Sequence, residues 1–94
     1  MTINYVIPIR VAGGCHVYYG RLNNGNWFLT SDSYDWYGYE LTENLIDCIW
    51  EEDLETKRFK GKGVRVIEED EYNKFHEELM KWLIDNGHSE FINY

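Results

Sequence analysis

The dipeptide Asn24-Gly25 constrains the fold of this chain more than any other feature of the sequence. It lies between two runs of aromatic and aliphatic residues, and Asn-Gly in that setting is the strongest short-range signal for a β-hairpin. The surrounding stretch His16–Tyr39 holds eight of the sixteen aromatic residues of the chain. We therefore expect an aromatic hairpin followed by an aromatic exit loop.

A two-residue turn at this dipeptide decides which hairpin side chains share a face, because side chains alternate along a strand. It predicts one face with Leu22, Trp27 and Leu29, which we take as the core side. The opposite face carries Tyr19 and Phe28 and is also apolar. A chain this short covers both faces with difficulty, so the second face is a candidate surface for a partner or for a second copy.

Two further strands are predicted on either side of this region. Tyr5–Val11 alternates apolar and other residues, and Pro8 removes a backbone donor, which favours the edge of a sheet. The short apolar run Val64–Ile67 reads as one more strand that joins the sheet.

A first helix is predicted after Thr42, which can act as its N-cap. Leu41 and Ile46 then have the spacing of a hydrophobic staple across the cap. On the exposed side of this helix, four acidic residues follow one another at four-residue spacing and form an acidic ridge: Glu43, Asp47, Glu51 and Glu55.

A second helix is predicted from Asp70, its expected N-cap, to about Asn86, with Gly87 as the stop signal. Its apolar residues fall on one face, which we expect to cover the hairpin: Tyr72, Phe75, Leu79, Trp82 and Leu83.

Together these elements predict an α+β fold in a single compact domain spanning residues 1–94. The small, mostly antiparallel sheet has three or four strands and packs against two helices, in the order β-β-β-α-β-α.

The charge of the chain narrows the choice of partners. Seventeen acidic and nine basic residues give a net charge of −8, which opposes direct binding to nucleic acid or to an anionic membrane and favours a basic protein. No apolar run is long enough to span a membrane. The N-terminus lacks the pattern of a secretory signal, and Cys15 and Cys48 match no redox or ligand spacing. We therefore expect a cytoplasmic protein with reduced thiols.

Residue patterns for catalysis or metal binding are missing from the sequence. Cys15 and His16 are neighbours, and adjacent side chains on a strand point to opposite faces, which opposes a nucleophile–base pair. The three histidines and the acid clusters lack the spacing of metal ligands. We expect no enzyme, no metal and no cofactor.

Our first functional hypothesis is an acidic, non-catalytic domain that binds a basic partner, such as a nucleic-acid-binding protein. Ridge carboxylates about 6 Å apart along a helix would mimic the phosphate spacing of DNA. Small inhibitors share this size and charge, among them immunity proteins, antitoxins and phage-encoded blockers of host defence, which suggests a bacterial or phage context. The partner-binding residues would be the acidic ridge and the exit loop: Glu43, Asp47, Glu51, Glu55, Trp36, Tyr37 and Tyr39.

Two alternatives come from other functional classes. The first is a small-ligand or nucleotide-binding module, in which the loop rings stack on a flat molecule and the basic residues Arg58, Lys60 and Lys62 contact a phosphate. The same basic run, residues 57–65, has a simpler role if it only neutralises the acidic helix. The second alternative is a structural or oligomerising domain that self-associates through the Tyr19/Phe28 face.

Overall fold

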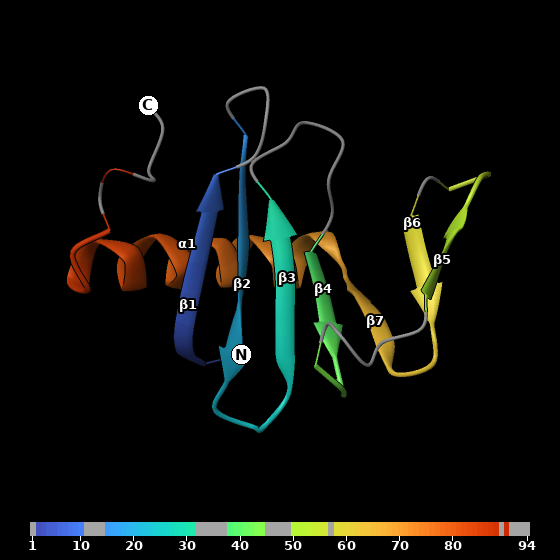
Figure 1. Ribbon diagram of the computed structural model, residues 1–94, viewed down its shortest axis with the longest axis horizontal. Helices are drawn as coiled ribbons and strands as arrows, with labels where there is room; N and C mark the ends of the chain where they lie inside the picture. The colour runs from blue at the N-terminus through green and yellow to red at the C-terminus, as the bar shows by residue number, and fades with distance from the viewer. Residues whose placement is uncertain are drawn as a thin grey trace.

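The computed structural model of the chain describes residues 2–10, 15–31, 38–44, 50–56, 58–88 and 90. Within this part of the chain there are seven strands and one helix (Figure 1). In chain order they are β1 (Ile3–Arg10), β2 (His16–Leu22), β3 (Trp27–Ser31), β4 (Gly38–Leu41), β5 (Trp50–Asp53), β6 (Arg58–Gly61), β7 (Val64–Ile67) and α1 (Glu69–Asp85).

The strands form two antiparallel sheets. The larger sheet has the order β1-β2-β3-β4-β7, and β5 and β6 pair as a separate hairpin. Helix α1 crosses one face of the large sheet, and the β5–β6 hairpin lies beside β7, at the end away from β1 (Figure 1). Strand β1 is at the edge, where Pro8 is tolerated, as the sequence predicted.

The hairpin at Asn24-Gly25 is present, but its predicted register is wrong by one residue. Leu22 N donates to the carbonyl of Asn26 at 2.8 Å, and Gly25 N donates to the carbonyl of Leu22 at 3.1 Å. Gly25 has φ +93°, so the loop has three residues and ends on a glycine in the left-handed region. Strand pairing then places Gly20 opposite Phe28.

This shift exchanges the faces of β3, because one residue of slip turns every side chain to the other side. Phe28 is fully buried against α1, with its ring 5.0 Å from that of Phe75. Trp27 and Leu29 lie on the outer face, with Tyr19. The predicted core face of Leu22, Trp27 and Leu29 is therefore wrong for β3, and Tyr19 and Phe28 do not share a surface.

The helix predicted after Thr42 is contradicted where the structure describes it. Residues 50–53 form β5, which pairs with β6, and residues 54–56 form the turn between them. Asp53 Oδ1 accepts hydrogen bonds from the backbone N–H of Glu55 at 3.0 Å and of Thr56 at 3.5 Å, which fixes this turn. Glu51 and Lys60 are opposite each other across the pair, so charge also favours the strand.

The C-terminal helix is confirmed. It begins after Glu68, two residues before the predicted cap at Asp70, and ends at Asp85, before Gly87 at φ +80°. In the described part of the chain, no helix has both the length and the apolar character required to cross a membrane.

Buried side chains form one cluster on each face of the large sheet. The inner cluster lies between the sheet and α1 and consists of Ile3, Val6, Tyr18, Leu22, Phe28, Ile67, Phe75, Leu79 and Leu83. The outer cluster is smaller and is centred on Leu29, Tyr39 and Leu41.

The predicted fold class is therefore corrected. The mostly antiparallel sheet is confirmed, but the described residues form five strands in it and not three or four. The two helices and the order β-β-β-α-β-α are also wrong, because the acidic segment at Trp50–Asp53 and the basic segment at Arg58–Gly61 pair as strands.

Candidate functional site

A cluster of charged side chains joins the first turn of α1 to the sheet at its β4–β7 end. Arg65 Nε donates to Glu40 at 3.1 Å, and Arg65 Nη2 also contacts this carboxylate. Arg65 Nη1 donates to Glu71 Oε1 at 2.7 Å, so one guanidinium bridges two carboxylates. Asn24 and Asn26 donate to the second oxygen of Glu40 at 3.1 and 2.8 Å. Two side chains of the hairpin loop thus hydrogen-bond the oxygen of the buried Glu40 carboxylate that Arg65 does not contact.

These contacts keep the cluster ionised. Burial of Glu40 favours its neutral form, but hydrogen bonds from Asn26, Arg65 and Asn24 outweigh burial and lower the pKa of Glu40 from its ordinary value. The Arg65 hydrogen bond also lowers the pKa of Glu71. The hydrogen bonds to Glu71 and Glu40 in turn raise the pKa of Arg65. These three side chains therefore stay charged around neutral pH, and their hydrogen bonds stabilise the fold.

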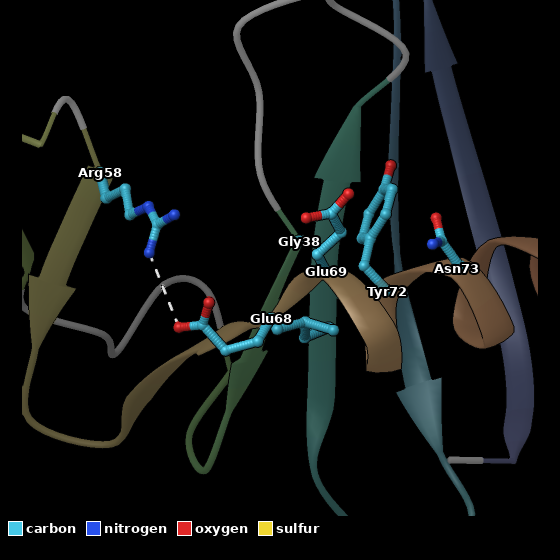
Figure 2. A pocket seen from close by; sticks show the side chains of 7 residues that line it. Gly38, Arg58, Glu68, Glu69, Tyr72 and Asn73 are labelled. Atoms are coloured by element: carbon cyan, nitrogen blue, oxygen red, sulfur yellow. Dashed lines mark ion pairs between the residues drawn. The ribbon is translucent and has the colours of Figure 1, made fainter.

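Beside this cluster lies a cavity of about 500 Å³, which we call the α1 hollow (Figure 2). It is bounded by β4, β6, the end of β7 and the first turns of α1. The residues that line it are Gly38, Arg58, Ile67, Glu68, Glu69, Tyr72 and Asn73.

Gly38 allows the helix to come this close to the sheet. A Cβ at this position would lie 2.9 Å from the ring of Tyr72 and 3.2 Å from Cδ1 of Ile67. The Tyr72 ring packs there instead, and its hydroxyl is 3.4 Å from Oγ1 of Thr30. The ring of Tyr72 therefore forms part of the lining of the hollow, and its hydroxyl lies close to Thr30.

The rim of the hollow carries more negative than positive charge. Arg58 reaches from β6 toward Glu68, with Nη1 at 3.6 Å from Oε1, as the dashed line in Figure 2 shows. Glu69 projects from the first turn of α1 on the same side and is exposed. An anion in the hollow would meet both carboxylates, whereas a cation would meet them together with an aromatic ring.

The three described residues of the predicted acidic ridge do not lie on a helix. Glu43 is exposed and precedes β5, Glu51 is on β5, and Glu55 is in the turn after it. Asp47 lies outside the described residues. The 6 Å spacing of a DNA-like helix therefore has no basis in this segment.

The predicted aromatic loop has a different role at its one described residue. Tyr39 is fully buried on β4, and its hydroxyl accepts a hydrogen bond from the backbone N–H of Phe59 at 3.1 Å. The two rings meet edge to face at 6.1 Å. Tyr39 therefore attaches the β5–β6 hairpin to the sheet and is closed to a ligand, while Trp36 and Tyr37 lie outside the described residues.

The basic residues proposed for a phosphate do not converge. Arg58 lines the α1 hollow and pairs with Glu68, whereas Lys60 Nζ lies 3.8 Å from Glu51 Oε1. Lys62 is exposed in the turn before β7. Arg58 and Lys60 do pair with acids, but these acids lie before α1 and on β5. The simpler role, neutralising an acidic helix, therefore does not apply as predicted, because residues 50–53 form a strand.

Sequence reasoning missed Glu40 and the residues of the hollow. Glu40 stands between Tyr39 and Leu41, and the alternation of a short strand would have placed it on the opposite side from both. Glu68 and Glu69 belong to an acid cluster that lacks the spacing of metal ligands, and sequence reasoning assigned them no binding role. Their position beside Arg58 depends on the β5–β6 hairpin, which the sequence pattern did not predict.

No group of metal-ligating side chains is found within the described residues. Comparison with protein-family models, with curated proteins and with solved structures gave no match. The site therefore has to be interpreted from its own geometry and charge.

Proposed function

We propose that this chain is an acidic, non-catalytic protein-binding domain that docks onto a basic surface of another protein, with a lysine or arginine of the partner entering the α1 hollow. The observation that carries the proposal is that Glu68, Glu69 and the ring of Tyr72 line the same cavity. Carboxylates and an aromatic ring are the groups that bind a cationic side chain in proteins.

Size and long-range charge support the same function. A volume of about 500 Å³ lies within the range of small-molecule pockets, so it admits one long side chain. The net charge of −8 attracts basic surfaces and speeds encounter with them. Two further exposed acids, Glu51 and Glu52, lie on β5, the strand that pairs with β6, and would add to the charged rim of such an interface.

We also propose that the protein acts in the cytoplasm. Cys15 is a free, half-buried thiol, which is usual where thiols stay reduced. The class of small inhibitors, including immunity proteins and antitoxins, stays a prediction from size and charge. DNA mimicry is withdrawn, because it depended on the helical spacing of the acidic ridge.

The experiment is affinity capture from host lysate with the wild type and two charge-reversal variants. Glu69→Lys changes the rim of the α1 hollow. Asp85→Lys makes the same change in net charge at the other end of α1, sixteen residues or about 24 Å along the helix axis. Circular dichroism verifies that both variants are folded.

The proposal predicts that wild type and Asp85→Lys retain the same basic protein, that Glu69→Lys loses it, and that added salt weakens capture. If Glu69→Lys and Asp85→Lys capture the same proteins as wild type, the α1 hollow is not the binding site.

A further inference from the structure

Arg58 brings a cation of the chain itself to the α1 hollow. It lines the cavity from β6, and its Nη1 lies 3.6 Å from Glu68 Oε1, along the dashed line in Figure 2. Glu68 lines the same cavity, directly before the first turn of α1. A basic side chain that enters the hollow therefore meets a carboxylate to which Arg58 is already drawn.

The pair between Arg58 and Glu68 is of a kind that costs little to exchange. The distance of 3.6 Å between these two atoms is longer than a hydrogen bond. The two side chains are 34% and 71% exposed, so water and salt weaken their attraction. A second cation of the same charge can therefore take the place of Arg58 at this carboxylate.

The backbone of Arg58 is held beside the hollow by the residue that follows it. Phe59 N donates to the hydroxyl of the buried Tyr39 on β4 at 3.1 Å, and the two rings meet edge to face. Strand β6, which begins at Arg58, is also paired with β5. When its side chain leaves Glu68, the guanidinium stays tethered near the cavity and competes with any cation that enters.

The other basic side chain of β6 has a different position. Lys60 lies two residues further along the strand, and its Nζ is 3.8 Å from Glu51 Oε1 on β5. It is not among the residues that line the hollow. Within this strand, Arg58 is therefore the residue placed to compete for the site.

We propose that Arg58 is a built-in competitor for the α1 hollow, which pairs with Glu68 in the free protein and is displaced when a basic side chain of the partner enters. This inference rests on the proposed function and adds a regulator to the same site. Arg58 thereby restricts which partners bind, because a partner's cation must interact with the hollow more favourably than the tethered one does.

The experiment measures the dissociation constant of N-acetyl-arginine methylamide by NMR titration of the wild type and three variants. Arg58→Gln removes the competing charge, and Arg58→Lys keeps it. Lys60→Gln changes the net charge by the same amount on the same strand, outside the hollow. Circular dichroism verifies that the variants are folded. The side-chain Nε–H signal of Arg58 is also followed in the wild type, which tests displacement directly even if Arg58→Gln does not fold.

The proposal predicts that Arg58→Gln binds the probe about two- to fivefold more tightly than the wild type, the effect expected of one exposed ion pair. Lys60→Gln changes the dissociation constant by less than about 1.5-fold, because its charge lies outside the hollow and is screened. Arg58→Lys binds as the wild type does. In the wild type, the Arg58 Nε–H signal shifts with the same dissociation constant as the backbone signals of the hollow.

Failure of this inference differs from failure of the proposed function. The inference is overturned if the wild type binds the probe and Arg58→Gln binds it no more tightly, if Lys60→Gln tightens binding equally, or if the Arg58 signal does not shift. The proposed function stands in each of these cases. If neither the wild type nor any variant binds the probe, the inference and the proposed function are both overturned.

Discussion

At the β1 end of the sheet, α1 packs against the strands mainly through apolar side chains, with one hydrogen bond from Ile3 N to Glu78 Oε2 at 3.2 Å. At the β7 end it meets the sheet through carboxylates that Arg65 holds. Leu83 and Val6 belong to the buried cluster at the first end. Glu40 and Glu71 share one guanidinium at the second. The first kind of contact depends little on pH or salt, while the second requires that its acids stay ionised.

The difference follows from the order of the chain. Residues 1–31 supply strands without acids, so their outer face can stay apolar, and α1 covers their inner face. The later strands bring acidic and basic segments together, and their charges are satisfied by pairing across strands and with α1. Exposed carboxylates remain at that end, beside the α1 hollow.

The largest expected effect is at the apolar end. Leu83→Ala leaves a cavity under α1 and should lower the free energy of unfolding by about 3 kcal/mol, measured by urea denaturation. Ile7→Ala on the exposed outer face should cost less than about 1 kcal/mol in the same assay. Equal losses would show that the inner cluster under α1 and the outer face of β1 are not buried differently.

A smaller effect, which depends on pH, is expected at the β7 end of the sheet, where Arg65 holds Glu40 and Glu71. Glu40→Gln should lower the free energy of unfolding by about 1–2 kcal/mol at pH 7, because a buried charge-assisted hydrogen-bond acceptor is lost. The folded pKa values of Glu40 and Glu71 are lowered, so their stabilisation is present above the ordinary carboxyl pKa of about 4.3 and is lost as pH falls through the lowered values.

Urea denaturation between pH 7 and 3 measures this contribution. The wild type should lose more stability than Glu40→Gln over that range, and Glu77→Gln, at an exposed position on α1, should follow the wild type. A Glu40→Gln curve parallel to that of the wild type would show that ionisation of Glu40 does not contribute to stability.

The smallest effect concerns the attachment of the β5–β6 hairpin. Tyr39→Phe removes the acceptor of the Phe59 backbone N–H and should cost about 1 kcal/mol. Amide hydrogen exchange should accelerate at Phe59 and leave β1 and β2 unchanged. Exchange that accelerates throughout the large sheet would mean that the hairpin and the sheet open as one unit.

The sequence was sufficient to predict an element of the fold where one local pattern dominated. Helix α1, strand β7 and the edge position of Pro8 were predicted from periodicity and backbone chemistry. The register of the hairpin was missed because Asn23–Asn26 permits both a two-residue and a three-residue loop. The three-residue loop lets the Asn24 and Asn26 side chains reach Glu40, a residue distant in sequence.

The first predicted helix, after Thr42, failed for a related reason. The segment before Thr56 has a plausible helical pattern on its own, but its Glu51 lies opposite Lys60 in the structure. The periodicity of one segment does not indicate that it will pair with another strand. The α1 hollow was missed with it, because Arg58 reaches Glu68 only from this hairpin.

The central claim is that the α1 hollow, at the β7 end of the sheet, receives a basic side chain of a partner. It is tested most directly by NMR. N-acetyl-arginine methylamide is titrated into ¹⁵N-labelled protein, with the citrulline analogue as an uncharged control of the same shape. We predict saturable shifts confined to the residues of the α1 hollow, absent with citrulline and lost in Glu69→Lys. Shifts of equal size with citrulline, or shifts spread over every acidic segment, would contradict the claim.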